Sequence, residues 1–158
     1  MPPDGPNDGS YWALVSPYWS NLNEAWVLGS DVFLARLEAI PVRSRHLYAS
    51  HWCYSEVVNG GFYQFFYNAT GILAPESASA FRAMDAGVLA DLVADAMLYF
   101  GTTYPRDREL RLSRLGHFQH PDPAAVALFE PFTQSFYAWC NASRDRWERT
   151  ADSYARSA

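Results

Sequence analysis

The sequence predicts an all-α protein, a single compact domain of about seven or eight helices around an aromatic-rich core. Apolar residues recur at helical spacing, most clearly at Leu89, Leu92, Val93 and Ala96. No segment alternates between polar and apolar residues as a half-buried strand does. Aromatic residues make up 16% of the 158 residues and apolar residues 49%, enough for one buried core.

Residues 1–10 are expected to form a flexible leader, because they lack the basic start and the apolar segment of a signal peptide. Residues 11–158 form the predicted helical domain. No apolar run is long enough to span a membrane, so we expect a cytoplasmic protein without a membrane partner. Cys53 and Cys140 lie far apart and match no metal or redox spacing, which favours reduced thiols.

Capping residues and prolines predict where most helices begin. Proline is favoured in the first turn of a helix, and a Ser or Asp before it can cap the helix N terminus. Such signals lie at Ser16-Pro17, Ser30, Pro41, Pro75, Pro105 and Asp122-Pro123. Residues 116–123 are expected to form a loop. The helical pattern then continues to the end of the chain, with a break or kink expected at Pro131.

The stretch from residue 56 to residue 71 is the most distinctive part of the chain. Between a Gly-Gly pair and Gly71 it carries five aromatic residues: Phe62, Tyr63, Phe65, Phe66 and Tyr67. Four polar residues are set among these rings: Glu56, Asn59, Gln64 and Asn68. Polar side chains carried into a core need hydrogen-bond partners, so we expect a buried polar network at a helix junction.

The same stretch predicts a helix break. Residues 42–58 contain neither Gly nor Pro and are apolar on most of their circumference, which predicts a central helix. Asn59-Gly60-Gly61 predicts the end of this helix, because Asn and Gly tolerate the left-handed conformation found at helix ends. A second, short helix is expected over residues 62–68.

Two interpretations of the polar residues remain open. In the first, they form a structural network in which side chains satisfy the backbone groups left free at helix ends. In the second, they line a pocket in which Glu56 acts as a base. Both use the same set: Glu56, Asn59, Gly60, Gly61, Gln64 and Asn68. We assign no catalytic residue, because neither cysteine has an identifiable base partner.

Histidine spacing does not favour a metal site. His51 and Cys53 are two residues apart and point away from each other on a helix, although His46 and Glu56 are near them. His117 and His120 would need further ligands that their loop does not offer beyond Asp122. We therefore expect neither a metal nor a cofactor.

The charge is unevenly distributed. All twelve basic residues are Arg, and the formal net charge of −5 divides into −6 for residues 1–100 and +1 for residues 101–158. An acidic front half disfavours direct nucleic-acid binding and is compatible with a basic protein partner. The candidate partner-binding acids are Glu76, Asp85, Asp91 and Asp95. Asp91 and Asp95 are expected on the polar face of one helix, with no base beside them.

The central motif also resembles a known family. The run from Ser55 to Phe62, continued by Gln64-Phe65-Phe66 and Asn68, resembles the bacterial DNA-mimic-protein-like family, a domain of unknown function with a Glu-x-x-Asn-Gly-Gly-Phe-x-Gln-Phe-Phe-x-Asn motif. Supporting segments are Ala74-Pro75-Glu76, Phe81-Arg82-Ala83 and Tyr104-Pro105-Arg106-Asp107-Arg108. The resemblance covers about residues 45–115 and, more loosely, residues 129–137.

This resemblance implies a largely helical fold. Most members of the family have no assigned activity, and the namesake is an acidic protein whose surface carboxylates imitate DNA phosphates and occupy a DNA-binding protein. We therefore expect a non-enzymatic interaction module that binds a basic DNA-binding protein or a nuclease-like toxin. The alternatives are a small-molecule-binding protein or enzyme with a pocket at Glu56, Gln64 and Asn68, and a scaffold with another partner surface. The oligomeric state stays open.

Overall fold

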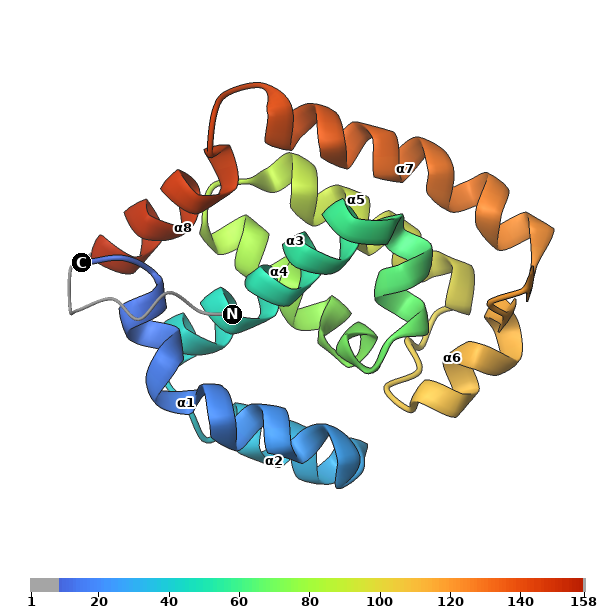
Figure 1. The fold of residues 1–158 in the computed structure, drawn as a ribbon, viewed down its shortest axis with the longest axis horizontal. Helices are drawn as coiled ribbons and strands as arrows, with labels where there is room; N and C mark the ends of the chain where they lie inside the picture. Colours follow the sequence, from blue (N-terminus) through green and yellow to red (C-terminus); the bar gives the residue numbers. More distant parts are fainter. Residues whose placement is uncertain (1–8, 158) are drawn as a thin grey trace.

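A computed structural model describes residues 9–157 and confirms the all-α prediction (Figure 1). The α-helices are α1 (Trp12–Glu24), α2 (Ser30–Glu38), α3 (Val42–Tyr67), α4 (Ala74–Ala83), α5 (Gly87–Met97), α6 (Arg108–Leu115), α7 (Pro123–Asn141) and α8 (Arg146–Arg156). Three short 3-10 helices are η1 (Ala25–Val27), η2 (Ala69–Leu73) and η3 (Leu98–Phe100). Most of the expected leader, residues 1–8, lies outside the described residues.

Helix α3 runs through the centre of the molecule. It contacts α1, α4, α6, α7 and α8, as expected for a helix that is apolar on most sides. Helix α7 runs along one side of the fold, and α1 and α2 lie on the opposite side (Figure 1). The start of the described chain is joined to α8, because the Tyr11 backbone N–H donates to Asp152 Oδ1 over 2.8 Å.

Phenylalanine supplies most of the largest fully buried side chains of the core. The fully buried rings include Phe33, Phe62, Phe65, Phe66, Phe81, Phe100 and Phe136. Phe66 lies among them, with its ring centroid 5.1 Å from that of Phe100 and 5.2 Å from that of Phe129. Burying one such ring contributes about 1.5–3 kcal/mol, so the aromatic stretch of α3 supplies much of the apolar driving force.

The predicted break at Gly60 and Gly61 is confirmed. Both residues have non-helical backbone angles, Gly60 with φ −153° and Gly61 with φ 76°, and the chain resumes as helix directly afterwards. The Phe62 backbone N–H, which the break leaves free, donates to Thr133 Oγ1 of α7 over 3.1 Å. A Cβ atom at Gly61 would lie 3.0 Å from the same oxygen. The break therefore brings α3 and α7 into close contact.

Two helix starts differ from those predicted. Pro17 lies inside α1, which begins five residues earlier at Trp12. The centroid of the Trp12 indole lies 6.1 Å from that of the His51 ring on α3. This tertiary contact outweighs the local preference for proline in the first turn. Pro105 lies before α6, whose N-cap is Asp107, because the Asp107 side chain accepts from the Leu110 N–H. The starts at Ser30, Pro41 and Asp122-Pro123 are confirmed.

Of the break or kink expected at Pro131, the break is wrong. Helix α7 continues through this exposed proline, because its neighbours Phe129 and Phe136 keep one face of the helix buried. The chain breaks instead after Asn141, where Asp145 adopts a left-handed conformation with φ 52° before α8 begins. The expected loop 116–123 contains a short antiparallel pair, β1 (Gly116–His117) with β2 (His120–Pro121).

No helix between residues 9 and 157 has both the length and the apolar character needed to cross a membrane.

Candidate functional site

The predicted polar residues around Glu56 form one hydrogen-bonded network. The Glu56 side chain extends from α3 and the residue is 9% exposed. Its Oε2 accepts from Gln64 Nε2 over 2.7 Å and from Asn68 Nδ2 over 2.9 Å. Its Oε1 accepts from Thr70 Oγ1 over 2.9 Å. The carboxylate therefore joins α3 before the Gly-Gly break to the residues after it.

Gly60 and Gly61 make room for different neighbours, Gly60 for Gln64 of this network and Gly61 for Thr133 of α7. Asn59 Nδ2 donates to Gln64 Oε1 over 3.2 Å, so Gln64 folds back over the break. A Cβ atom at Gly60 would lie 2.0 Å from Gln64 Oε1, and any larger residue would displace this side chain. Gly61 faces Thr133 of α7 instead. A cavity of about 250 Å³ adjoins both glycines, but Glu56, Gln64 and Asn68 do not line it.

Arg111 is the residue of this region that sequence reasoning missed. It is fully buried, and its guanidinium donates to the carbonyls of Phe66 (3.0 Å) and Asn68 (3.1 Å) at the end of α3. It also donates to the carbonyls of Pro105 and Arg106. Burial lowers the pKa of Arg111. The sequence contained no signal for this role, because the residue lies in a helix with a polar, surface-like pattern.

Neighbouring donors bind carbonyls at the end of α3 and in η2, which follows it. Arg108 Nε donates to the Tyr67 carbonyl over 2.9 Å, and Tyr104 OH donates to the Gly71 carbonyl over 2.6 Å. Carbonyls at a helix C terminus carry partial negative charge and have no partner within the helix. The segment 104–111 supplies those partners.

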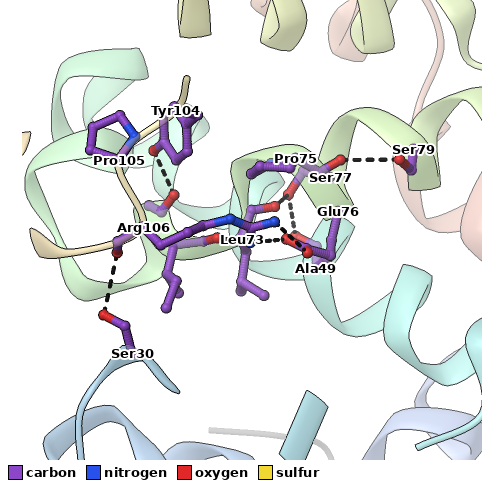
Figure 2. Close-up of polar contacts among 12 residues, drawn as sticks. Ser30, Ala49, Leu73, Pro75, Glu76, Ser77, Ser79, Tyr104, Pro105 and Arg106 are labelled. Atoms are coloured by element: carbon purple, nitrogen blue, oxygen red, sulfur yellow. Dashed lines mark hydrogen bonds and ion pairs between the residues drawn. The ribbon is translucent and has the colours of Figure 1, made fainter. Parts of the chain in front are cut away.

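Glu76, one of the four candidate partner-binding acids, is engaged inside the fold (Figure 2). Its two carboxylate oxygens accept from Arg106 Nη1 over 2.7 Å and from Arg106 Nη2 over 2.9 Å. This bidentate pair is one-fifth to one-third exposed and joins α4 to the loop before α6. Figure 2 also shows Ser77, whose hydroxyl donates to the carbonyls of Ala49 and Leu73 and so ties α4 to α3.

The other three acids are exposed on α5 and on the turn that precedes it. Asp85 lies in the turn between α4 and α5 with φ 61°, and Asp91 and Asp95 follow on the solvent face of α5. The expectation of no neighbouring base is wrong for Asp91, whose Oδ1 lies 2.9 Å from Arg82 Nη2. Arg82 reaches it from the end of α4, because α4 and α5 pack together.

Most arginines bind helix ends and not carboxylates. Nine of the twelve donate to backbone carbonyls: Arg36, Arg43, Arg45, Arg106, Arg108, Arg111, Arg114, Arg146 and Arg156. Among residues 9–157, only Arg82, Arg106 and Arg144 form ion pairs with acids. Many cationic charges therefore lie at the negative ends of helices, and most carboxylates of the described residues have no ion-pair partner.

The histidines of α3 are bonded to tyrosines. His46 Nδ1 lies 2.7 Å from Tyr154 OH, and His51 Nδ1 lies 3.1 Å from Tyr11 OH. Across the described residues, no three His, Cys, Asp or Glu side chains are grouped so that they could hold a metal ion.

Comparison with known proteins identifies a family. A family model described as DMP19-like protein matches residues 38–157, which include all of α3 to α8 and leave out α1. Searches of curated proteins and of solved structures returned no significant match.

Proposed function

Because the chain belongs to the DMP19-like protein family, we propose that it is a non-enzymatic interaction module that binds a basic protein through an acidic helical surface. The contact residues in this proposal are Asp85, Asp91 and Asp95. The class of partner, a DNA-binding protein or a nuclease-like toxin, follows from the resemblance of the central motif to DNA-mimic-like proteins. Glu76 is left out of the contact surface because both of its oxygens bind Arg106.

The observation that supports this proposal most is the exposure of Asp85, Asp91 and Asp95, of which only Asp91 forms an ion pair within residues 9–157. Asp91 and Asp95 are one helical turn apart, a rise of about 6 Å, on an exposed face. The Arg82–Asp91 pair is about two-thirds exposed on both sides. Such surface pairs contribute only about 0–1 kcal/mol, so a basic partner can displace Arg82 at little cost.

The alternative of a pocket at Glu56, Gln64 and Asn68 has less support. The Glu56 oxygens already accept three hydrogen bonds from side chains of the same network. The neighbouring cavity is lined by Gly60 and Gly61 and by α7, not by the three polar side chains. A base or ligand-binding role would require this network to open.

The test compares two triple variants of equal charge. Asp85→Asn, Asp91→Asn and Asp95→Asn remove the proposed surface, whereas Glu24→Gln, Asp31→Asn and Glu38→Gln remove three exposed acids from α1 and α2. Immobilised wild-type protein captures partners from its native cell at low salt. We expect it to retain a DNA-binding or nuclease-like protein that elutes as salt rises, because exposed charges are screened within about 8–10 Å at physiological ionic strength.

The α5 variant is expected to lose at least about tenfold in affinity for that protein, and the α1–α2 variant to keep it. The wild-type protein should also compete with DNA for the captured protein. Equal losses in both variants, salt-independent retention, or a captured protein that never binds DNA would contradict the proposal.

A further inference from the structure

A polar groove lies between α8 and the turn that joins α4 to α5. Its volume is about 550 Å³, within the range of small-molecule sites. The residues that matter for its chemistry are Asp85, Ser143, Arg146, Arg149, Thr150 and Ser153. Four of them, Arg146, Arg149, Thr150 and Ser153, recur at intervals of three and four residues and so share one face of α8.

Both arginines of the groove are held in place without a carboxylate partner. The Arg146 guanidinium carbon lies 4.0 Å from the centroid of the Trp139 ring, and Arg146 Nη1 donates to the Trp139 carbonyl over 3.0 Å. Arg149 Nη2 donates to Ser143 Oγ over 2.6 Å. Neither forms an ion pair within residues 9–157, whereas Arg144 on the same turn pairs with Asp145.

These contacts leave most of the donors free. A guanidinium has five N–H groups in a planar fork that matches phosphate oxygens, and the contacts above use one N–H of Arg146 and one of Arg149. Two positioned cations lower the ordering cost of binding a multiply charged anion. One guanidinium is enough to bind a single carboxylate. Two guanidinium groups together therefore favour a ligand group with more oxygens and more charge.

We propose that this groove binds a small phosphorylated molecule, with Arg146 and Arg149 holding the phosphate and Ser153 near its edge. Asp91 and Asp95 do not line this groove, and the proposal does not depend on the protein partner. Asp85 is the one residue that the two proposals share. Its carboxylate favours a basic protein and repels a phosphate, so its removal is expected to affect the two kinds of binding in opposite directions.

Inorganic phosphate is the probe, titrated into the full chain at constant ionic strength with chloride as the balancing anion. Arginine side-chain NMR signals of Arg146 and Arg149 are expected to shift and saturate. Arg149→Gln should weaken phosphate binding at least about fivefold, and Asp85→Asn should strengthen it about two- to fivefold, as expected for charge interactions at an exposed surface. The matched control is Arg144→Gln, since the Arg144 side chain is 95% exposed and outside this groove.

The amide spectrum of each variant checks that it is folded. Shifts that do not saturate, or a loss in Arg144→Gln as large as that in Arg149→Gln, would overturn the phosphate site. An unchanged affinity in Asp85→Asn would overturn the placement of the anion beside this turn. Partner capture by Arg149→Gln separates the two proposals, because the loss of the arginine should leave binding through α5 intact.

Discussion

Arg111 donates its Nε–H to the backbone carbonyl of Phe66 over 3.0 Å, although the two residues are 45 positions apart and the arginine is fully buried. No ion pair with a carboxylate compensates this cation within residues 9–157. Its charge is stabilised instead by four carbonyls, two of them at the negatively polarised end of α3. A buried charge is tolerated when its donors are satisfied in this way.

The substitution Arg111→Lys should therefore destabilise the protein by about 3 kcal/mol, because one ammonium cannot reach both pairs of carbonyls and each unsatisfied buried group costs about 1–3 kcal/mol. Urea unfolding followed by circular dichroism measures the loss. Arg114→Lys is the control, since Arg114 is exposed and donates to one carbonyl, that of Phe100. A loss in Arg111→Lys no larger than the control would show that the cap on α3 is unimportant.

Glu56 is expected to stabilise the fold through the hydrogen bonds that its carboxylate accepts. Glu56→Leu removes the acceptor of three donors and should cost about 3 kcal/mol in unfolding free energy. Glu56→Gln should cost about 1 kcal/mol, because its amide oxygen can accept from Gln64 and Asn68 while its amide nitrogen donates to the Thr70 hydroxyl. Equal costs in urea unfolding for the two variants would mean that these hydrogen bonds contribute little.

Local chemistry predicted the parts of the fold that depend on neighbouring residues. The break at Gly60-Gly61 and the cap at Asp122-Pro123 follow from backbone preferences that are fixed within a few positions. The closeness of Glu56 to Gln64 and Asn68 was also predictable. A change of direction at Gly60-Gly61 brings the residues after the break back beside the last turn of the helix before it. Local rules favour a helix start at Pro17 and permit a break at Pro131, but the core packing of partly buried aromatics on α1 and of buried Phe129 and Phe136 on α7 outweighs them.

The remaining features depend on partners that are distant in the sequence. Arg108, Arg111 and Arg114 recur every three residues in one polar helix, and nothing local distinguishes the buried one from the others. Glu76 was predicted as a surface acid, yet it binds Arg106 thirty positions later. Long-range pairing of this kind is set by tertiary packing, which one sequence does not specify.

Gly61 should tolerate substitution much less well than Gly87. Gly61→Ala places a Cβ atom 3.0 Å from Thr133 Oγ1 at a position with φ 76°, and we expect a loss of about 1–3 kcal/mol. Gly87 begins α5 with open space around its Cβ position, so Gly87→Ala should be neutral or stabilise by up to about 1 kcal/mol. Thermal unfolding of both variants gives the comparison, and a neutral Gly61→Ala would contradict the tight contact between α3 and α7.

His51 is expected to make stability depend on pH. Its ring is surrounded by five aromatic side chains, Tyr11, Trp12, Trp19, Trp52 and Trp147. Burial lowers the pKa of His51 from 6.5 to about 4, so the folded state favours the neutral imidazole. Between these two values the unfolded chain binds more protons than the folded one, and stability therefore falls as pH decreases from about 6.5 toward about 4.

Urea unfolding at about pH 7.5 and about pH 5.0 measures this effect, which should amount to about 2 kcal/mol for His51. His51→Gln removes the titrating group, so the difference between the two pH values should shrink by that amount even if the variant is less stable overall. Burial also lowers the pKa of His46, which adds a contribution of the same sign. His46→Gln is the matched control and should shrink the difference less, because His46 is less deeply enclosed by aromatic rings. An unchanged pH dependence in His51→Gln would mean that the aromatic cage admits the charged imidazole.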